Sequence, residues 1–188
     1  MAEQAQAINR EASESTYRTP AGAKLAAGIA AGIVGGILMI GFMMVYADRT
    51  GAGATTPLKA LGGLVYGLEA MVAGPTAILA GVAIQLGFLI VIGILFAMCM
   101  SRETSTVAAL FAGIVVGIAI WAAMYWYVMP LENPTMAART ALIPQAYFIA
   151  HVLFGVGLAA TPSFIRTFSR ERQRRNPMPA QRILPTVP

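Results

Sequence analysis

The segment LAAGIAAGIVGGILMIGFMMVYA, at residues 25–47, decides the fold because it runs for 23 residues without a charged side chain. A helix that rises about 1.5 Å per residue needs about 20 such residues to cross about 30 Å of hydrocarbon. Three further charge-free stretches reach that length, at residues 76–100, 107–129 and 146–165. The sequence therefore predicts an all-α, polytopic membrane protein with four transmembrane helices.

The composition of the whole chain supports this fold class. Of its 188 residues, 57% are hydrophobic and only 11% are charged, against about 25% charged residues in soluble domains. A soluble fold is excluded, and so is a barrel, whose strands alternate polar and apolar residues over about ten positions. The net charge of +5 would suggest nucleic-acid binding in a soluble protein, but here we interpret it as membrane topology and expect no nucleic-acid partner.

The basic residues are distributed unequally between the two sides of the predicted membrane domain. Ten of the 13 Lys and Arg residues lie before the first span, in the second loop or after the fourth span. Basic segments stay cytoplasmic, so we expect both termini on the cytoplasmic side of the membrane. The predicted parts are a polar segment 1–23, a transmembrane domain 24–165 and a basic, Pro-rich tail 166–188.

The tail has two interpretations. Its basic residues either only enforce this orientation, which we favour, or recognise lipid headgroups or a partner, since each adds about 1 kcal/mol of attraction near an anionic leaflet. The residues concerned are Arg166, Arg170, Arg172, Arg174 and Arg175.

A short repeat indicates how the four spans are organised. The sequence Ala31-Gly-Ile-Val-Gly-Gly-Ile37 in the first span recurs as Ala112-Gly-Ile-Val-Val-Gly-Ile118 in the third. Each copy is followed by a Pro-bearing loop and a return span, which predicts two tandem helical hairpins of the same orientation. The first loop is long enough for an amphipathic helix near residues 57–72, which we expect to lie flat on the outer surface.

Small residues recur at helical spacing in these spans. Such faces let helix backbones approach closely, and close packing is a main cohesive term in lipid. We expect the first and third helices to cross there, although contact with another protein would use the same faces. The predicted packing residues are Gly28, Gly32, Gly36, Gly113, Gly117 and Gly155.

A polar layer within the spans is the best candidate for a site. His151, the only histidine, and Gln85 lie at similar predicted depth, and Trp121 and Tyr125 are placed to complete the layer. Polar groups at this depth usually face the bundle interior. Three interpretations compete: a hydrogen-bonded pin such as Gln85 to His151, which we favour, a small-molecule or proton path, and a b-type haem that would pair His151 with a methionine.

The chain resembles a group of bacterial inner-membrane proteins with four spans and no known activity. The resemblance covers roughly residues 25–161 and rests on Thr56-Pro-Leu-Lys59, on Pro130-Leu-Glu-Asn-Pro134 and on Ala150-His-Val-Leu-Phe-Gly155. It implies the four-span architecture and a bacterial origin. Some members have a second histidine in the second span where this chain has Gln85, which argues against a two-histidine haem site.

No catalytic constellation is visible in the sequence, which lacks a phosphate loop, a nucleophile elbow and a His-Glu metal motif. We therefore expect no enzyme activity, no cofactor and no metal. The leading expectation is a non-catalytic membrane subunit that packs in a larger inner-membrane complex, with the lipid bilayer and other membrane subunits as partners. The alternatives are a small transporter or channel at the Gln85/His151 level, and a b-type haem electron carrier.

Overall fold

The computed structural model describes residues 19–175, except for the side chains at positions 134, 135, 173 and 175. The predicted cytoplasmic segment up to residue 18 and the tail from residue 176 lie outside the described residues. The described chain is helical and contains no strand. Its elements are α2 (Ala21–Arg49), α3 (Thr56–Tyr66), the 3-10 helix η1 (Gly67–Met71), α4 (Pro75–Cys99), α5 (Thr106–Ala123), the π-helix η2 (Met124–Val128), α6 (Met129–Glu132), α7 (Pro134–Leu142), α8 (Pro144–Leu158) and α9 (Thr161–Arg175).

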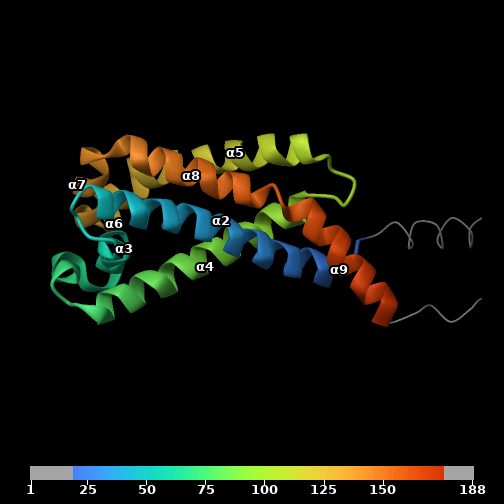
Figure 1. Ribbon diagram of the computed structural model, residues 1–188, viewed down its shortest axis with the longest axis horizontal. Helices are drawn as coiled ribbons and strands as arrows, with labels where there is room; N and C mark the ends of the chain where they lie inside the picture. The colour runs from blue at the N-terminus through green and yellow to red at the C-terminus, as the bar shows by residue number, and fades with distance from the viewer. Residues whose placement is uncertain (1–18, 176–188) are drawn as a thin grey trace, which may run out of the picture.

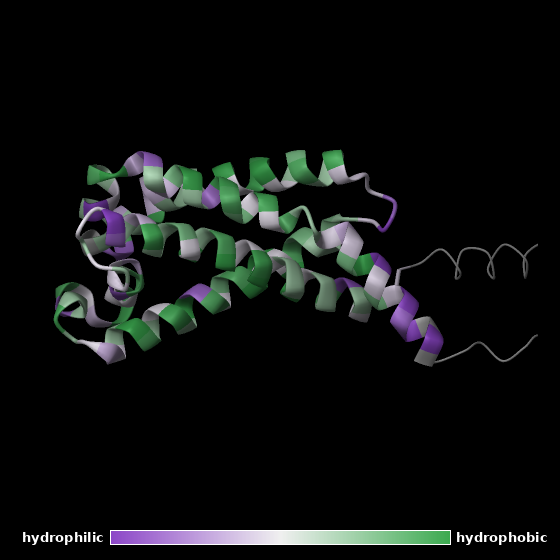
Figure 2. Ribbon diagram, in the orientation of Figure 1, coloured by the Kyte–Doolittle hydropathy of each residue, from purple (hydrophilic) through white to green (hydrophobic). Residues whose placement is uncertain are grey.

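Four helical segments within residues 19–175 are long and apolar enough to cross a membrane: Ala21–Arg49, Pro75–Cys99, Thr106–Glu132 and Pro144–Arg172. Figure 2 shows that hydrophobic residues predominate along these segments, with the hydrophilic residues gathered in the α4–α5 loop, along α9 and in the loops at the opposite end. The predicted fold class is confirmed, because this all-helical chain has the spans of a polytopic membrane protein.

The spans form two hairpins that lie side by side. Helix α2 packs on α4, α5 packs on α8, and the hairpins meet where α2 contacts α8 (Figure 1). Below, the loop end is the end that carries residues 50–74 and 129–143, and the terminal end is the one that carries residues 100–105 and α9. The prediction of two tandem hairpins is confirmed.

The glycine faces act within the hairpins. A Cβ atom on Gly32 would overlap the carbonyl oxygen of Leu89 in α4, and one on Gly113 would overlap that of Gly155 in α8. The expectation that the first and third helices cross at these faces is therefore wrong. Each face instead brings a span against the span that follows it, and α2 meets the second hairpin through Gly35, whose Cβ would lie 2.6 Å from the oxygen of Phe154.

The fourth span, expected to be continuous over 146–165, is interrupted after Leu158. Pro162 has no N–H to donate to the carbonyl of Leu158, and its ring crowds that carbonyl. The hydroxyl of Thr161 donates to the same oxygen instead, at 2.6 Å. The chain therefore turns, and α9 leaves the axis of α8 and packs against the start of α2 (Figure 1).

The helix expected near residues 57–72 ends earlier as an α-helix, and the 3-10 helix η1 continues the chain to Met71. Helix α3 stops at Tyr66, and glycines on both helices let α3 and α4 pack closely. Gly62 of α3 lies against Ala77 of α4, and Gly81 of α4 lies against Leu58 of α3. Helix α3 thus occupies the wedge between the diverging ends of α2 and α4 (Figure 1). Among the apolar residues of this segment, Leu58 and Leu61 are buried, whereas Val65, Leu68 and Val72 are exposed.

Candidate functional site

His151 lies in the contact between α5 and α8. Its side chain is buried, and its Nδ1 atom lies 2.7 Å from the carbonyl oxygen of Tyr147, one turn earlier in α8. A Cβ atom on Gly117 would overlap the carbonyl oxygen of His151. The absence of a side chain at Gly117 therefore lets α5 approach the turn of α8 that carries the histidine.

Gln85 occupies the equivalent position in the first hairpin. A Cβ atom on Gly32 would meet Leu89 first and then Gly93 at 3.5 Å, just as one on Gly113 would meet Gly155 first and then Ala159 at 3.5 Å. The two hairpins therefore share one register, in which Leu89 corresponds to Gly155, and Gln85, one turn earlier, corresponds to His151.

The two polar side chains nevertheless have different partners. The amide of Gln85 lies 3.7 Å from the Sδ atom of Met39 in α2. Within residues 19–175 no hydrogen bond joins Gln85 to His151. The reason is the order of the helices, because α2 lies between α4 and α8 and contacts both. Gln85 thus bonds across the contact between α2 and α4, whereas the hydrogen bond of His151 lies within α8.

Trp121 and Tyr125 do lie together. Their rings stack with centroids 5.5 Å apart, and Trp121 also makes an edge contact of 5.1 Å with Phe148 of α8. Tyr125 belongs to the π-helix η2, a type of element that often occurs at functional sites. The indole Nε1 of Trp121 is buried and has no hydrogen-bond partner in the described part of the chain.

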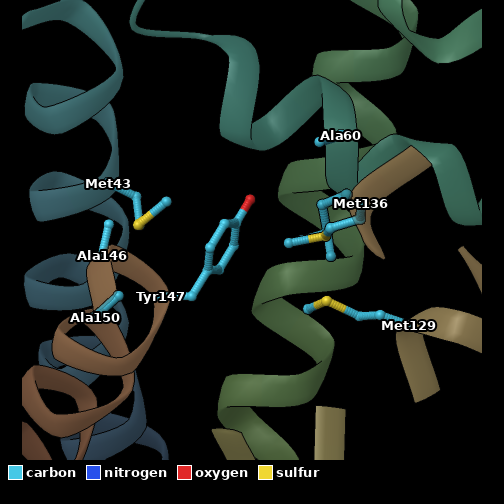
Figure 3. Packing of buried hydrophobic residues seen from close by; sticks show 8 residues of the cluster. Met43, Ala60, Met129, Met136, Ala146, Tyr147 and Ala150 are labelled. Atoms are coloured by element: carbon cyan, nitrogen blue, oxygen red, sulfur yellow. The ribbon is translucent and has the colours of Figure 1, made fainter. Parts of the chain in front are cut away.

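A methionine-rich cluster fills the loop end of the bundle. Figure 3 shows the ring of Tyr147 between Met43 of α2 and the methionines of α6 and α7, Met129 and Met136. Tyr147 is buried in this cluster. Methionine side chains adapt to irregular gaps and make favourable contacts with aromatic rings, which suits a core assembled from five helices.

Asn133 connects the two long loops, and the sequence analysis did not identify it as a site residue. Its Nδ2 donates to the carbonyl of Ala60 in α3 at 2.9 Å, and its Oδ1 accepts from the backbone N–H of Met136 at 3.1 Å. An asparagine before a helix-starting proline is a recognisable N-cap signal. The bond to Ala60 has no such signal, because it joins residues 73 positions apart.

A pocket of about 190 Å³ opens at the loop end between α2, α3, α7 and α8. It is mainly apolar, and Arg139 and the buried Tyr147 are among its lining residues. Its volume is below the ~300–1,000 Å³ of sites for drug-sized ligands, so it would admit only a small group.

The predicted basic tail residues lie on α9 at the terminal end. Arg166 is half-buried and donates from Nη1 to the carbonyl of Arg102 at 2.9 Å. Arg170, Arg172 and Arg174 are exposed, and Arg175 is the last residue of the helix. The first basic residue of the tail thus points back onto the α4–α5 loop.

No family model, curated protein or solved structure matches this chain. The fold defines the class of protein: an all-helical polytopic membrane protein built of two tandem hairpins. That the chain is related to four-span bacterial inner-membrane proteins stays a prediction.

Proposed function

We propose that this chain is a non-catalytic integral subunit that packs in a larger bacterial inner-membrane complex, with both termini in the cytoplasm. The orientation rests on the excess of basic residues at the terminal end, which favours the cytoplasmic side.

The observation that carries the proposal is the apolar surface of the loop end. Val65, Leu68, Val72 and Leu142 lie outside the four spans, yet they are among the most exposed apolar side chains of the described residues. Exposed apolar patches mark protein or membrane contacts. We infer a protein contact, because α3 and η1 are held in a fixed position by their packing on α4 and α7.

The interior contacts support the same proposal. Gln85, Asn133 and His151 each have a hydrogen-bond partner inside the bundle or its loops. Glycines fix the helix register within both hairpins. These contacts are consistent with structural roles for the interior residues, which is what we propose for a subunit that offers a rigid surface to a neighbour.

A photo-crosslinking pair tests the proposal. A photoreactive residue at Val72, which is 84% exposed in the loop end, should capture another membrane protein in intact cells. The matched control is Leu79, 68% exposed but inside the α4 span, which should crosslink mainly to lipid. Native mass measurement in mild detergent should then show the same protein bound. Crosslinks only to lipid at both positions, with a chain that is always alone, would contradict the proposal.

A small transporter or channel remains a second candidate. It is favoured by the buried, unpartnered indole Nε1 of Trp121 beside the His151 turn, because this donor is available to a passing or bound molecule. Replacing His151 by Leu should then abolish a flux measured in proteoliposomes. If the change only lowers the thermal stability, this candidate fails. The haem alternative requires a Soret band in the purified protein.

A further inference from the structure

An open cavity of about 310 Å³, lined by charged and polar residues, lies at the terminal end, apart from the polar layer and from the loop-end surface. It is lined by the residues Arg102, Glu103, Arg166, Ser169 and Arg170. The first two belong to the α4–α5 loop, and the others to one side of α9. At about 30 Å³ per water molecule, the space holds roughly ten waters, enough for a tetrahedral anion and the ester that carries it.

The charge of this cavity favours an anion. Three arginines and one glutamate give its lining a formal charge of +2. A phosphate monoester carries about −1.5 to −2 at pH 7, so one such group balances the lining. Guanidinium groups also bind phosphate oxygens through two parallel hydrogen bonds, which a lysine cannot reproduce.

The guanidinium group of Arg166 is held in place by two hydrogen bonds. Its Nη1 donates to the carbonyl of Arg102 at 2.9 Å and its Nη2 donates to Ser163 Oγ at 3.0 Å. A guanidinium has five N–H donors, so these two bonds orient the group and leave donors for a further acceptor. The positive charge of Arg166 is thus fixed at the wall of the cavity.

Ser169 supplies an independent observation. The residue is only 7% exposed, and its Oγ is buried with no hydrogen-bond partner among the described residues. A buried hydroxyl without a partner is uncommon and requires an explanation. Ser169 lies one turn from Arg166 on the same side of α9 and lines the same cavity. A rotation about its Cα–Cβ bond would be needed to turn the buried hydroxyl toward a bound oxyanion.

We propose that this cavity binds a phosphate group, with Arg166 and Arg170 as its charged donors and Ser169 as a neutral donor. The group belongs to an anionic lipid of the adjacent leaflet, because Arg166 directly follows the charge-free stretch 146–165 and basic pockets at this level bind lipid headgroups. The proposal does not depend on a partner protein.

Native mass spectrometry of the full chain in dodecyl maltoside tests this proposal with three probes. Phosphatidic acid should remain bound, whereas diacylglycerol, which differs only in lacking the phosphate, should not. Inorganic phosphate alone distinguishes the source: binding of this ion as tight as that of phosphatidic acid assigns the site to a soluble phosphate, and much weaker binding assigns it to the lipid. Equal binding of phosphatidic acid and diacylglycerol would overturn the proposal.

Two arginine variants distinguish a specific phosphate site from non-specific electrostatic attraction between the lipid and α9. Arg170→Gln should weaken the binding of phosphatidic acid about tenfold, because one charge-assisted contact is lost. Arg174→Gln, one turn further along α9 and outside the cavity, removes the same charge and should change binding less than twofold. Both residues are exposed, so neither change should disturb folding. Equal losses in the two variants would overturn the proposal.

Ser169→Ala tests the hydroxyl. This change should leave the unfolding midpoint of the lipid-free protein unaltered or slightly raised, since it removes an unpartnered buried group. It should also reduce binding of phosphatidic acid severalfold. Unchanged binding would show that Ser169 does not contact the phosphate.

Discussion

Gly32 and Gly41 form a matched pair on α2 that tests the close approach of α2 and α4. A methyl group at Gly32 would overlap the carbonyl oxygen of Leu89, which belongs to the backbone and has little freedom to move. A methyl group at Gly41 would meet no atom within 4 Å. The same substitution, Gly→Ala, is therefore expected to be less favourable at Gly32 than at Gly41, although both residues lie on α2.

The magnitudes follow from two competing terms. Replacing glycine by alanine in a helix stabilises by about 1 kcal/mol, and both variants gain this term. Overpacking against an immobile neighbour costs about 1–3 kcal/mol, and only Gly32→Ala incurs it. The free energies of unfolding of the two variants should thus differ by about 1–3 kcal/mol, which is a roughly 5- to 150-fold difference in the unfolding equilibrium.

The assay is unfolding of the purified protein by sodium dodecyl sulfate in dodecyl maltoside micelles, followed by tryptophan fluorescence. Gly41→Ala should unfold at higher denaturant than the wild type, and Gly32→Ala at lower denaturant than Gly41→Ala. Gly113→Ala, the counterpart of Gly32 in the second hairpin, should behave like Gly32→Ala. If Gly32→Ala gains as much stability as Gly41→Ala, the helices do not depend on this contact and the reasoning is refuted.

Three further predictions concern the loops, the aromatic contact and the topology. Asn133→Ala should destabilise by about 2–4 kcal/mol and speed amide exchange in α3, because it removes the N-cap and leaves the Ala60 carbonyl unpaired. Asn133→Ser keeps a capping oxygen and should lose less, and unchanged exchange in α3 for both would contradict the bridge. Trp121→Phe removes an unpaired buried donor while keeping an aromatic ring, so the unfolding midpoint should stay the same or rise; a marked fall would mean that the indole N–H has a partner. Cys99, the single cysteine, is exposed at the terminal end, so a membrane-impermeant maleimide should label it in inverted vesicles and not in intact spheroplasts. The double variant Cys99→Ser, Ala52→Cys moves the thiol to the loop end and should give the reverse pattern, and labelling from the wrong face in either protein would reverse the proposed topology.

The membrane environment determined the features that the sequence predicted, whereas helix packing determined those that it did not predict. The length of the charge-free stretch 25–47 predicted a membrane span, because the transfer of a helix into hydrocarbon depends only on its own side chains. The repeat at Ala31 and Ala112 likewise predicted the hairpins, since equivalent sequences in equivalent solvent make equivalent contacts. The sequence alone thus predicted the four spans and their pairing into hairpins in sequence order.

The partners of individual residues were decided by the tertiary structure. Gly32 and Gly113 were recognised as packing residues, but their neighbours depended on how α2, α4, α5 and α8 are arranged in space. A face of small residues indicates that another helix backbone will approach closely, but it does not indicate which helix.

The same limit applies to the polar residues. Asn133 and Ser169 look like ordinary loop and tail residues in the sequence, and only the fold brings Asn133 to Ala60 and buries Ser169 beside two arginines. Span length is a local property of the chain, read directly from its composition. A hydrogen-bond partner or a cavity is a property of segments distant in sequence, and their meeting is set by the packing of all the helices together.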